Sequence, residues 1–270
     1  MIFVAGFGRM CNNMLQFGHF YAWGKERGLC VIALRFCYKY PFFRIKSQRG
    51  YNWLTYLAAK YGARLGLLRR VDFDCESCPG DARLDILQSS RFVVTGGWEF
   101  RDYEAFLRHS GELREMFAFK PSVVRRVELS LPPMPDDAIS LGVHVRRGDY
   151  SRWQEGKYLF TDEEYIKVIH SFAGYFEGRR IRTVIATNDK SLPAGVYREA
   201  LGVEVHLLSG SAGEDLYALS GCDYIIGPPS TFSLMASFYR DTPLYWIYDP
   251  AESASPTSFR RFDYLFRHII

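Results

Sequence analysis

From about residue 138 onward, strand-like and helix-like segments alternate, and this alternation restricts the fold more than any other feature of the chain. Each strand-like segment is a short apolar run bounded by polar residues, which is typical of a buried strand. These runs cover residues 139–145, 183–187, 203–208, 224–227 and 244–248. Helices are expected after the capping box Thr161-Asp-Glu-Glu164 and at residues 213–221 and 232–239. Strands that alternate with helices form a parallel, doubly wound sheet, so the sequence predicts an α/β fold.

The N-terminus shows the same pattern once. A strand at residues 2–5 leads into Gly6-Phe7-Gly8, a helix is expected at about 13–27, and a further strand at 30–34. A glycine loop that opens a helix is a natural cradle for a phosphate. The third glycine of a dinucleotide fingerprint is replaced by Cys11, however, so the two glycines alone would also fit a simple tight turn.

The middle of the chain is less regular. Helices are expected at residues 51–61 and 103–117, and a strand at 91–95. The best domain boundary is Leu131-Pro-Pro-Met-Pro-Asp-Asp137, because its prolines can neither continue a helix nor join a central strand. We therefore expect an N-terminal lobe at residues 1–130 and a C-terminal lobe at residues 138–270.

Polar side chains follow three of the predicted strands at the point where each strand ends. The three groups are Arg146-Arg147-Gly148-Asp149, Asn188-Asp189 and Ser230-Thr231. In an open α/β sheet, ligands bind just beyond the carboxyl ends of the strands. Guanidinium groups that face the start of a helix would bind a diphosphate without a metal ion. The alternative is that the arginines only pair with acids at a strand end, and the stretch alone leaves the two interpretations about even.

Composition excludes several classes of function. The formal net charge is only +4, and the basic pairs Arg69-Arg70, Arg125-Arg126 and Arg179-Arg180 are isolated, so we expect no nucleic-acid partner. Such pairs leave peripheral contact with an anionic membrane open, although a solvated face explains them more simply. No apolar run approaches the ~18–20 residues of a membrane span. The first residues lack the pattern of a secretory signal, and the six scattered cysteines are typical of free thiols in a reducing cytosol.

Two short patterns raise the question of a metal site. Cys75-Glu-Ser-Cys78 has the spacing of half a zinc site, but no second pair of this kind completes it. Asp72-Phe-Asp74 has the Asp-x-Asp pattern by which some glycosyltransferases hold a metal and a diphosphate. Patterns of three residues recur by chance, so we expect a solvated turn there and no metal in the protein.

The stretch His144-Val-Arg-Arg-Gly-Asp-Tyr150 resembles the His-x-Arg-Arg-x-Asp signature of α1,2-fucosyltransferases, glycosyltransferase family 11. The α1,6-fucosyltransferases and, more loosely, the protein O-fucosyltransferases share this signature. Residues 219–233 resemble the later motif of the family, and residues 6–16 resemble its entry segment. Three motifs in the right order are more specific than any one of them. Residues 35–120 show no match, and Pro228-Pro229 departs from the family pattern, which concerns acceptor specificity more than donor binding.

The resemblance implies a role for each matching residue. Arg146 would bind the β-phosphate of GDP-fucose, His144 would lie at the nucleoside end, and Asp215 would accept hydrogen bonds from guanine. Arg146 and Asp149 are the catalytic candidates, and Arg147 is a further donor-binding candidate. Arg147 and Asp149 would also support the fold. The remaining donor-binding candidates are Ser230, Thr231 and Phe232 around the diphosphate, and Gly6, Phe7, Gly8 and Asn13 from the other lobe. Asp215 and Thr231 would also be explained as helix caps.

The resemblance further implies a GT-B glycosyltransferase with two Rossmann-like lobes, the acceptor bound by the N-terminal lobe and GDP-fucose by the C-terminal lobe. Such an enzyme transfers fucose with inversion and without a metal ion or other cofactor. The expected acceptor is the 2-OH of a galactose in a glycan, which gives an α1,2 linkage. The rival interpretations are an α1,6-type or protein O-fucosyltransferase, and a non-catalytic nucleotide-binding protein. We expect the enzyme in a bacterial cytoplasm, and peripheral association with the inner face of the membrane is left open.

Overall fold

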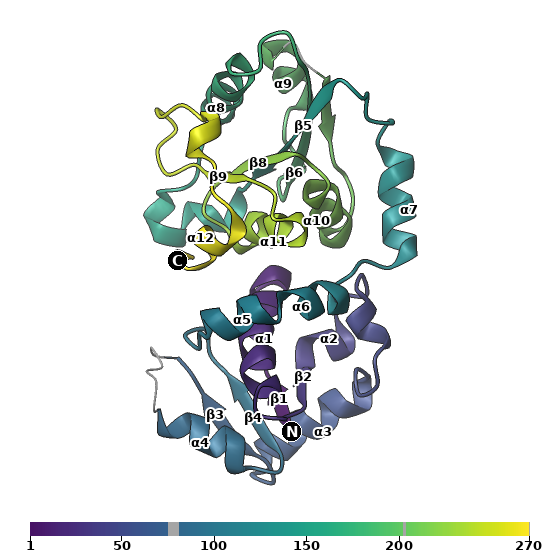
Figure 1. Ribbon diagram of the computed structural model, residues 1–270, viewed down its shortest axis with the longest axis vertical. Coiled ribbons are helices and arrows are strands. Elements are labelled where there is room, and N and C mark those ends of the chain that lie inside the picture. The colour runs from purple at the N-terminus through teal and green to yellow at the C-terminus, as the bar shows by residue number, and fades with distance from the viewer. Residues whose placement is uncertain (75–80, 202–203, 270) are drawn as a thin grey trace. The chain divides into compact units, whose positions relative to one another are not determined.

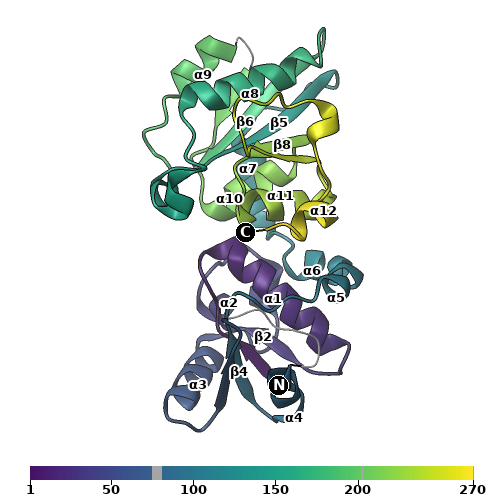
Figure 2. The same cartoon turned by 90° about the vertical axis from the view of Figure 1, so that its left-hand side faces the viewer.

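The computed structural model describes residues 1–74, 81–201 and 204–269. The chain divides into two compact units, Met1–Lys120 and Pro121–Ile270, and each is described here by itself. Figure 1 shows both units as α/β structures, and Figure 2 shows them from the side. Among the described residues, no helix is both long enough and apolar enough to cross a membrane.

The first unit is built on a four-stranded parallel sheet in the order β2-β1-β4-β3. Its strands are β1 (Ile2–Val4), β2 (Val31–Ala33), β3 (Arg69–Asp72) and β4 (Val93–Gly96). The strands other than β3 are fully buried, whereas β3 lies at the edge and exposes Arg69 and Arg70. Parallel strands covered on both faces read as continuous apolar runs, which explains why the sequence revealed three of these strands but not β3.

Helices surround this sheet. They are α1 (Met10–Lys25), α2 (Leu34–Tyr38), α3 (Trp53–Arg64), α4 (Ala82–Ser89), α5 (Tyr103–Arg108) and α6 (Ser110–Met116), with a short 3-10 turn at Arg44–Ser47. Helix α1 is buried along most of its length and packs on aromatic rings, for example Phe20 on Phe100 with ring centroids 4.3 Å apart. Buried aromatic side chains therefore make up much of the core of this unit.

The second unit contains a five-stranded parallel sheet in the order β7-β6-β5-β8-β9. The strands are β5 (Ala138–Val145), β6 (Arg180–Thr187), β7 (Glu204–Leu207), β8 (Tyr224–Gly227) and β9 (Leu244–Trp246). Strand β5 is central, and the chain runs from it to β6 on one side and later to β8 on the other. This is the switch point at which α/β sheets bind ligands.

The helices of the second unit cover both faces of its sheet. They are α7 (Pro121–Ser130), α8 (Asp162–Gly174), α9 (Ala194–Leu201), α10 (Ala212–Ser220), α11 (Thr231–Arg240) and α12 (Phe262–Phe266), with 3-10 turns at Gly148–Ser151, Trp153–Gly156 and Pro256–Ser258. The alternate residues Leu141, Val143 and Val145 of β5 share one core with α8 and α9. Gly142 faces α10 instead, where a Cβ atom would lie 2.9 Å from Leu219.

The predicted α/β class, with two parallel sheets, is confirmed, and the predicted strands of the second unit are present. The single helix expected at 103–117 is wrong, because the chain breaks at His109 into α5 and α6. The expected linker at 131–137 differs from the observed division, which falls between Lys120 and Pro121. The division comes earlier because α7, which the sequence did not reveal, packs on α10 within the second unit.

Candidate active site

Arg147, Asn188 and Ser230 lie at the carboxyl ends of three adjacent strands, β5, β6 and β8. The side chain of Asn188 joins two of these ends. Its Oδ1 accepts a hydrogen bond from the backbone N–H of Arg147 at 2.8 Å, and its Nδ2 donates to the carbonyl of Arg147 at 3.0 Å. The structure therefore brings together the polar groups that the sequence placed at separate strand ends.

Arg147 supports this edge of the sheet. Its guanidinium pairs with Asp162 Oδ1 at 2.6 Å, and the same oxygen accepts the Tyr197 hydroxyl at 2.7 Å. The guanidinium also lies over the Tyr165 ring, 5.9 Å from its centroid. An arginine paired with an acid at a strand end therefore describes Arg147, although its Nε is buried without a hydrogen-bond partner, and its part in donor binding stays a prediction.

Arg146 pairs with a carboxylate that is more exposed to water than the partner of Arg147. Its guanidinium pairs with Asp149 Oδ2 at 2.7 Å, but the Asp149 side chain is 45% exposed. The Arg146 Nε is buried without a hydrogen-bond partner, and the guanidinium lies 5.5 Å from the centroid of the Tyr150 ring. An ion pair with an exposed carboxylate contributes about 0–1 kcal/mol, so an anionic ligand displaces it at small cost. Asp149, expected as a catalytic candidate, is the ion-pair partner of Arg146, and its part in catalysis stays a prediction.

His144 is buried at the end of β5 beside this pair. Its ring lies against Phe232, with centroids 4.9 Å apart. Burial, with a smaller contribution from the positive charge of Arg146, lowers the pKa of His144 to about 3. The imidazole is therefore neutral at physiological pH, and it can shape the wall of a site but cannot supply a proton there.

The start of α11 faces the same edge of the sheet. Ser230 is the N-cap residue, and its hydroxyl accepts a hydrogen bond from the Phe232 N–H at 3.1 Å. The preceding loop is held by the Tyr150 hydroxyl, which donates to the Pro229 carbonyl at 2.5 Å. Burial raises the pKa of Tyr150 to about 12, so this hydroxyl keeps its proton. The first N–H groups and the dipole of α11 favour an anion in front of Thr231.

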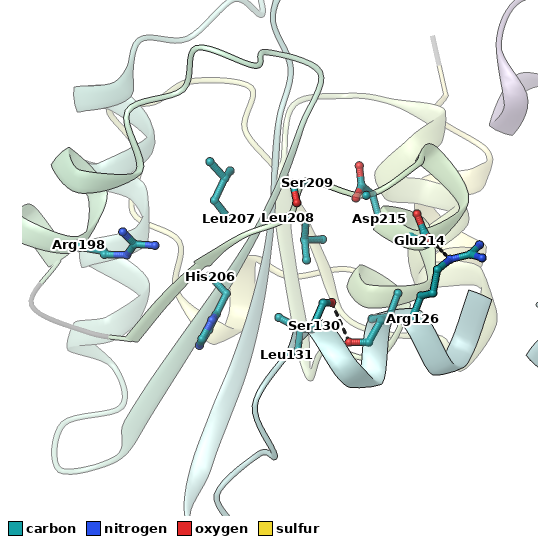
Figure 3. Close-up of a pocket in the computed structure, with 12 residues that line it drawn as sticks. Arg126, Ser130, Leu131, Arg198, His206, Leu207, Leu208, Ser209, Glu214 and Asp215 are labelled. Carbon is teal, nitrogen blue, oxygen red and sulfur yellow. Dashed lines mark hydrogen bonds and ion pairs between the residues drawn. The ribbon is translucent and has the colours of Figure 1, made fainter. Parts of the chain in front are cut away.

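A cavity of about 290 Å³ opens between α7, the end of β7 and the start of α10. Figure 3 shows Asp215 and Glu214 on one side of it and Arg198 and His206 on the other. Asp215 Oδ1 is buried without a hydrogen-bond partner, and the carboxylate receives one bond from the backbone of Gly210. Burial, and then the negative charge of Glu214, raises the pKa of Asp215 to about 6.

Glu214, the neighbouring acid, is fully engaged. It accepts hydrogen bonds from the backbone N–H and hydroxyl of Ser211 at 2.6 and 2.7 Å, and it pairs with Arg126 of α7. These bonds lower the pKa of Glu214 to about 2. Because Ser211 and Glu214 form the capping box of α10, a simple capping role for Asp215 is wrong. Sequence reasoning missed Arg126, since nothing in the pattern revealed α7.

The predicted N-terminal candidates lie in the first unit: Gly6, Phe7 and Gly8 in the loop between β1 and α1, and Asn13 in the first turn of α1. Asn13 shapes this loop, because its Nδ2 donates to the carbonyls of Phe7 at 2.8 Å and Arg9 at 2.6 Å. Gly8 has a φ of +58°, and a Cβ atom on Gly6 would collide with the Asn13 side chain, so both glycines are required by the backbone. Phe7 stacks on Trp98 with centroids 5.4 Å apart. Their part in donor binding stays a prediction.

The two candidate metal patterns lie in the first unit as well. Asp72 ends the edge strand β3 and pairs with Arg70 at 2.7 Å, so the expected solvated turn at this residue is wrong. Cys75 and Cys78 lie outside the described residues. In the described parts of the chain, no group of three or more His, Cys, Asp or Glu side chains is arranged to hold a metal ion.

The two parallel α/β units give the chain the GT-B fold of the solved structures that it resembles. The model of glycosyl transferase family 11 matches residues 79–254, and the chain belongs to this family. The protein is therefore an enzyme, and the alternative of a non-catalytic nucleotide-binding protein is wrong. No curated protein sequence matches the chain significantly.

Several solved structures of fucosyltransferases have the same fold. A mutant of Arabidopsis thaliana FUT1 in complex with GDP matches with a TM-score of 0.63 and 14% identity, over 96% of this chain and 73% of that chain. POFUT1 in complex with GDP-fucose matches with a TM-score of 0.60 and 14% identity, over 89% and 94% of the two chains. NodZ α-1,6-fucosyltransferase co-crystallised with GDP matches with a TM-score of 0.57 and 15% identity, over 91% and 94%.

Proposed function

We propose that the protein transfers L-fucose from GDP-fucose to a sugar hydroxyl, with inversion at C1 of fucose and without a metal ion. The observation that carries this proposal is the cavity beside α10, where Asp215 presents a buried carboxylate oxygen with no partner. Guanine offers two adjacent N–H donors on its Watson–Crick edge, and a carboxylate accepts both. Uracil and adenine offer no such pair, so this acid selects guanine. The similar structures with bound GDP or GDP-fucose support the same donor.

The diphosphate would bind between Arg146 and the start of α11. Arg146 would exchange Asp149 for a phosphate oxygen, and the start of α11, at Thr231, would bind another. When fucose C1 separates from the β-phosphate, negative charge grows on the leaving GDP. A fixed guanidinium and a helix dipole aimed at that charge stabilise the transition state, as a metal ion would.

For the acceptor, we propose the 2-OH of a galactose, giving an α1,2 linkage, because the motifs resemble α1,2-fucosyltransferases most closely. We further propose that the enzyme acts in a bacterial cytoplasm on precursors of surface polysaccharides or lipopolysaccharides. An α1,6-type or protein O-fucosyltransferase would use the same donor site and differ in the product.

Titration calorimetry with GDP in the presence of EDTA tests the donor site, with UDP and GDP-mannose as competitors. We expect GDP to bind, EDTA to have no effect, and UDP not to compete. Incubation with GDP-fucose and a galactoside, followed by NMR analysis of the product, tests the linkage. Failure to bind GDP would refute the proposed donor, whereas an α1,6 product would refute only the proposed linkage.

A further inference from the structure

The charge of the protein is distributed very unevenly along the chain. Residues 27–71 contain ten of the 34 Lys and Arg residues and no Asp or Glu, which leaves 24 basic against 30 acidic residues elsewhere. The net charge of +4 therefore conceals a strongly basic segment within an otherwise acidic protein. This segment includes β2, α2, α3 and most of β3, all in the first unit.

Helix α3, within this segment, exposes its apolar side chains. Leu54 is 77% exposed, and Trp53, Leu57 and Tyr61 are also exposed, whereas the only fully buried residue of the helix is Ala59. At about 100° per residue, the four exposed residues fall within an arc of about 100°, opposite Ala59. The following turn continues this surface with Leu65 and Leu67, which are 70% and 77% exposed. Figure 2 shows α3 on the outside of its unit.

Basic and aromatic side chains border this apolar face. Lys60, Arg64 and Arg69 are exposed and make no ion pair with any carboxylate in the described parts of the chain. Lys60 lies over the Tyr61 ring, 5.5 Å from its centroid. Trp53 stacks on Tyr38 with centroids 5.3 Å apart, which holds the indole at the surface. Large exposed apolar patches mark interaction sites, and this patch is surrounded by positive charge.

We propose that the face formed by α3 and the turn after it, residues 53–70, docks the enzyme on an anionic lipid bilayer. An interfacial helix inserts leucine and aromatic side chains at the level of the headgroups, while lysine and arginine contact anionic lipids. A nucleic acid would not bury Leu54, Leu65 and Leu67. A second copy would place this basic surface against itself across a two-fold axis, and like charges oppose such an interface. The proposal does not depend on the identity of the donor.

Flotation of the full-length protein with lipid vesicles tests the proposal. The vesicles consist of phosphatidylcholine alone or of phosphatidylcholine with phosphatidylglycerol, at low and high salt. The test variants are Leu54→Asp and Lys60→Glu. Matched controls are Leu129→Asp on α7, where the leucine is 81% exposed, and Lys167→Glu on α8, where the lysine is exposed. Thermal unfolding of each variant verifies that it folds.

We expect the wild-type protein to float with anionic vesicles and not with neutral ones, and high salt to release it. Each test variant should lower the partition coefficient by about tenfold or more, whereas the controls should change it less than about twofold. Absence of flotation with anionic vesicles would overturn the proposal, as would equal losses in the control variants. So would a dimer that Leu54→Asp dissociates in light scattering, or binding of RNA or DNA that Lys60→Glu abolishes.

Discussion

Replacing Asp215 by Asn should change stability and ligand binding in opposite directions. Burial raises the pKa of Asp215 from 3.8 to about 6 in the folded protein. A carboxyl group with a raised folded pKa binds its proton more tightly when folded, so its ionised form opposes folding. The penalty is absent below about pH 4, grows as the pH rises to about 6, and is complete above that. Two pKa units correspond to at most about 3 kcal/mol.

The amide introduced by Asp215→Asn carries no charge at any pH, so the free protein should be more stable than wild type by about 1–3 kcal/mol at pH 8. At pH 4 the difference should vanish, because Asp215 is then protonated. Binding of GDP should weaken at the same time. An amide keeps one acceptor and loses the charge, and a hydrogen bond to a charged group is worth about 1.5–3 kcal/mol, so affinity should fall by about tenfold to hundredfold.

The pH dependence separates this acid from the titration of the ligand. Wild-type affinity for GDP should fall up to about tenfold per pH unit below pH 6, because the proton on Asp215 must be removed before guanine binds. The terminal phosphate of GDP titrates with a pKa of about 6 as well. The Asp215→Asn variant retains the phosphate titration and loses that of the acid, so the difference between the two profiles belongs to Asp215.

Calorimetric titration with GDP between pH 5 and 8, with urea unfolding of the free protein at pH 4 and 8, measures both effects. Glu214→Gln is the matched control, since it removes the charge of the neighbouring acid and its ion pair with Arg126, whereas glutamine still fits the capping box. It should lower the free energy of unfolding and affect GDP binding less. If Asp215→Asn binds GDP as tightly as wild type at pH 8, or is less stable than wild type at that pH, the proposed guanine-binding role of Asp215 is refuted.

Further predictions concern the two arginines and the absence of a metal. Arg146→Ala should lower kcat by about a hundredfold or more, because a contact made to the leaving group in the transition state is worth ~2.7–4 kcal/mol, and a variant with full activity would place the donor site elsewhere. Arg147→Ala should instead lower the free energy of unfolding by about 1–3 kcal/mol in urea, since it leaves Asp162 without its cation. Asp149→Asn should alter kcat less than Arg146→Ala does and should leave the pH profile of kcat unchanged, since we infer that Asp149 acts only as the ion-pair partner of Arg146; loss of the basic limb of the profile would show that Asp149 transfers a proton. EDTA should leave the initial rate unchanged, and restoration of a lost rate by Mg²⁺ or Mn²⁺ would show that a metal takes part.

Much of the fold was predictable because buried parallel strands have a simple sequence pattern. Residues 139–145 alternate in the way that places Leu141, Val143 and Val145 in one core. Strand β3 was missed since an edge strand has few apolar residues, and its first two residues are exposed arginines. Helix α7 was missed because its apolar stripe is short, with Val123 and Val127 as its buried residues. Both elements were missed because few of their side chains are buried.

The candidate site was predictable in its location but not in its division of roles. The order of strands and helices along the sequence is enough to place Arg146, Asn188 and Ser230 at the carboxyl ends of their strands. Which of two neighbouring acids is engaged depends partly on residues elsewhere in the chain. Ser211 of the local capping box binds Glu214, and Arg126 of a distant helix adds an ion pair. Asp215 keeps a buried oxygen without a hydrogen-bond partner. The local sequence does not contain the contribution of Arg126, because this residue lies far away along the chain.

The same reasoning separates the two adjacent arginines. Asp162 binds both the Arg147 guanidinium and the Tyr197 hydroxyl. Removing the guanidinium therefore leaves the partly buried Asp162 carboxylate without a positive partner. Arg146 holds a carboxylate that is nearly half exposed, and water replaces this partner readily. A charge-assisted bond to a phosphate is stronger than such an exposed pair by about 1–2 kcal/mol, so the exchange from Asp149 to a diphosphate is favourable. Neighbours with the same side chain thus perform different tasks, one holding the edge of the sheet and the other free to change partner when the donor binds.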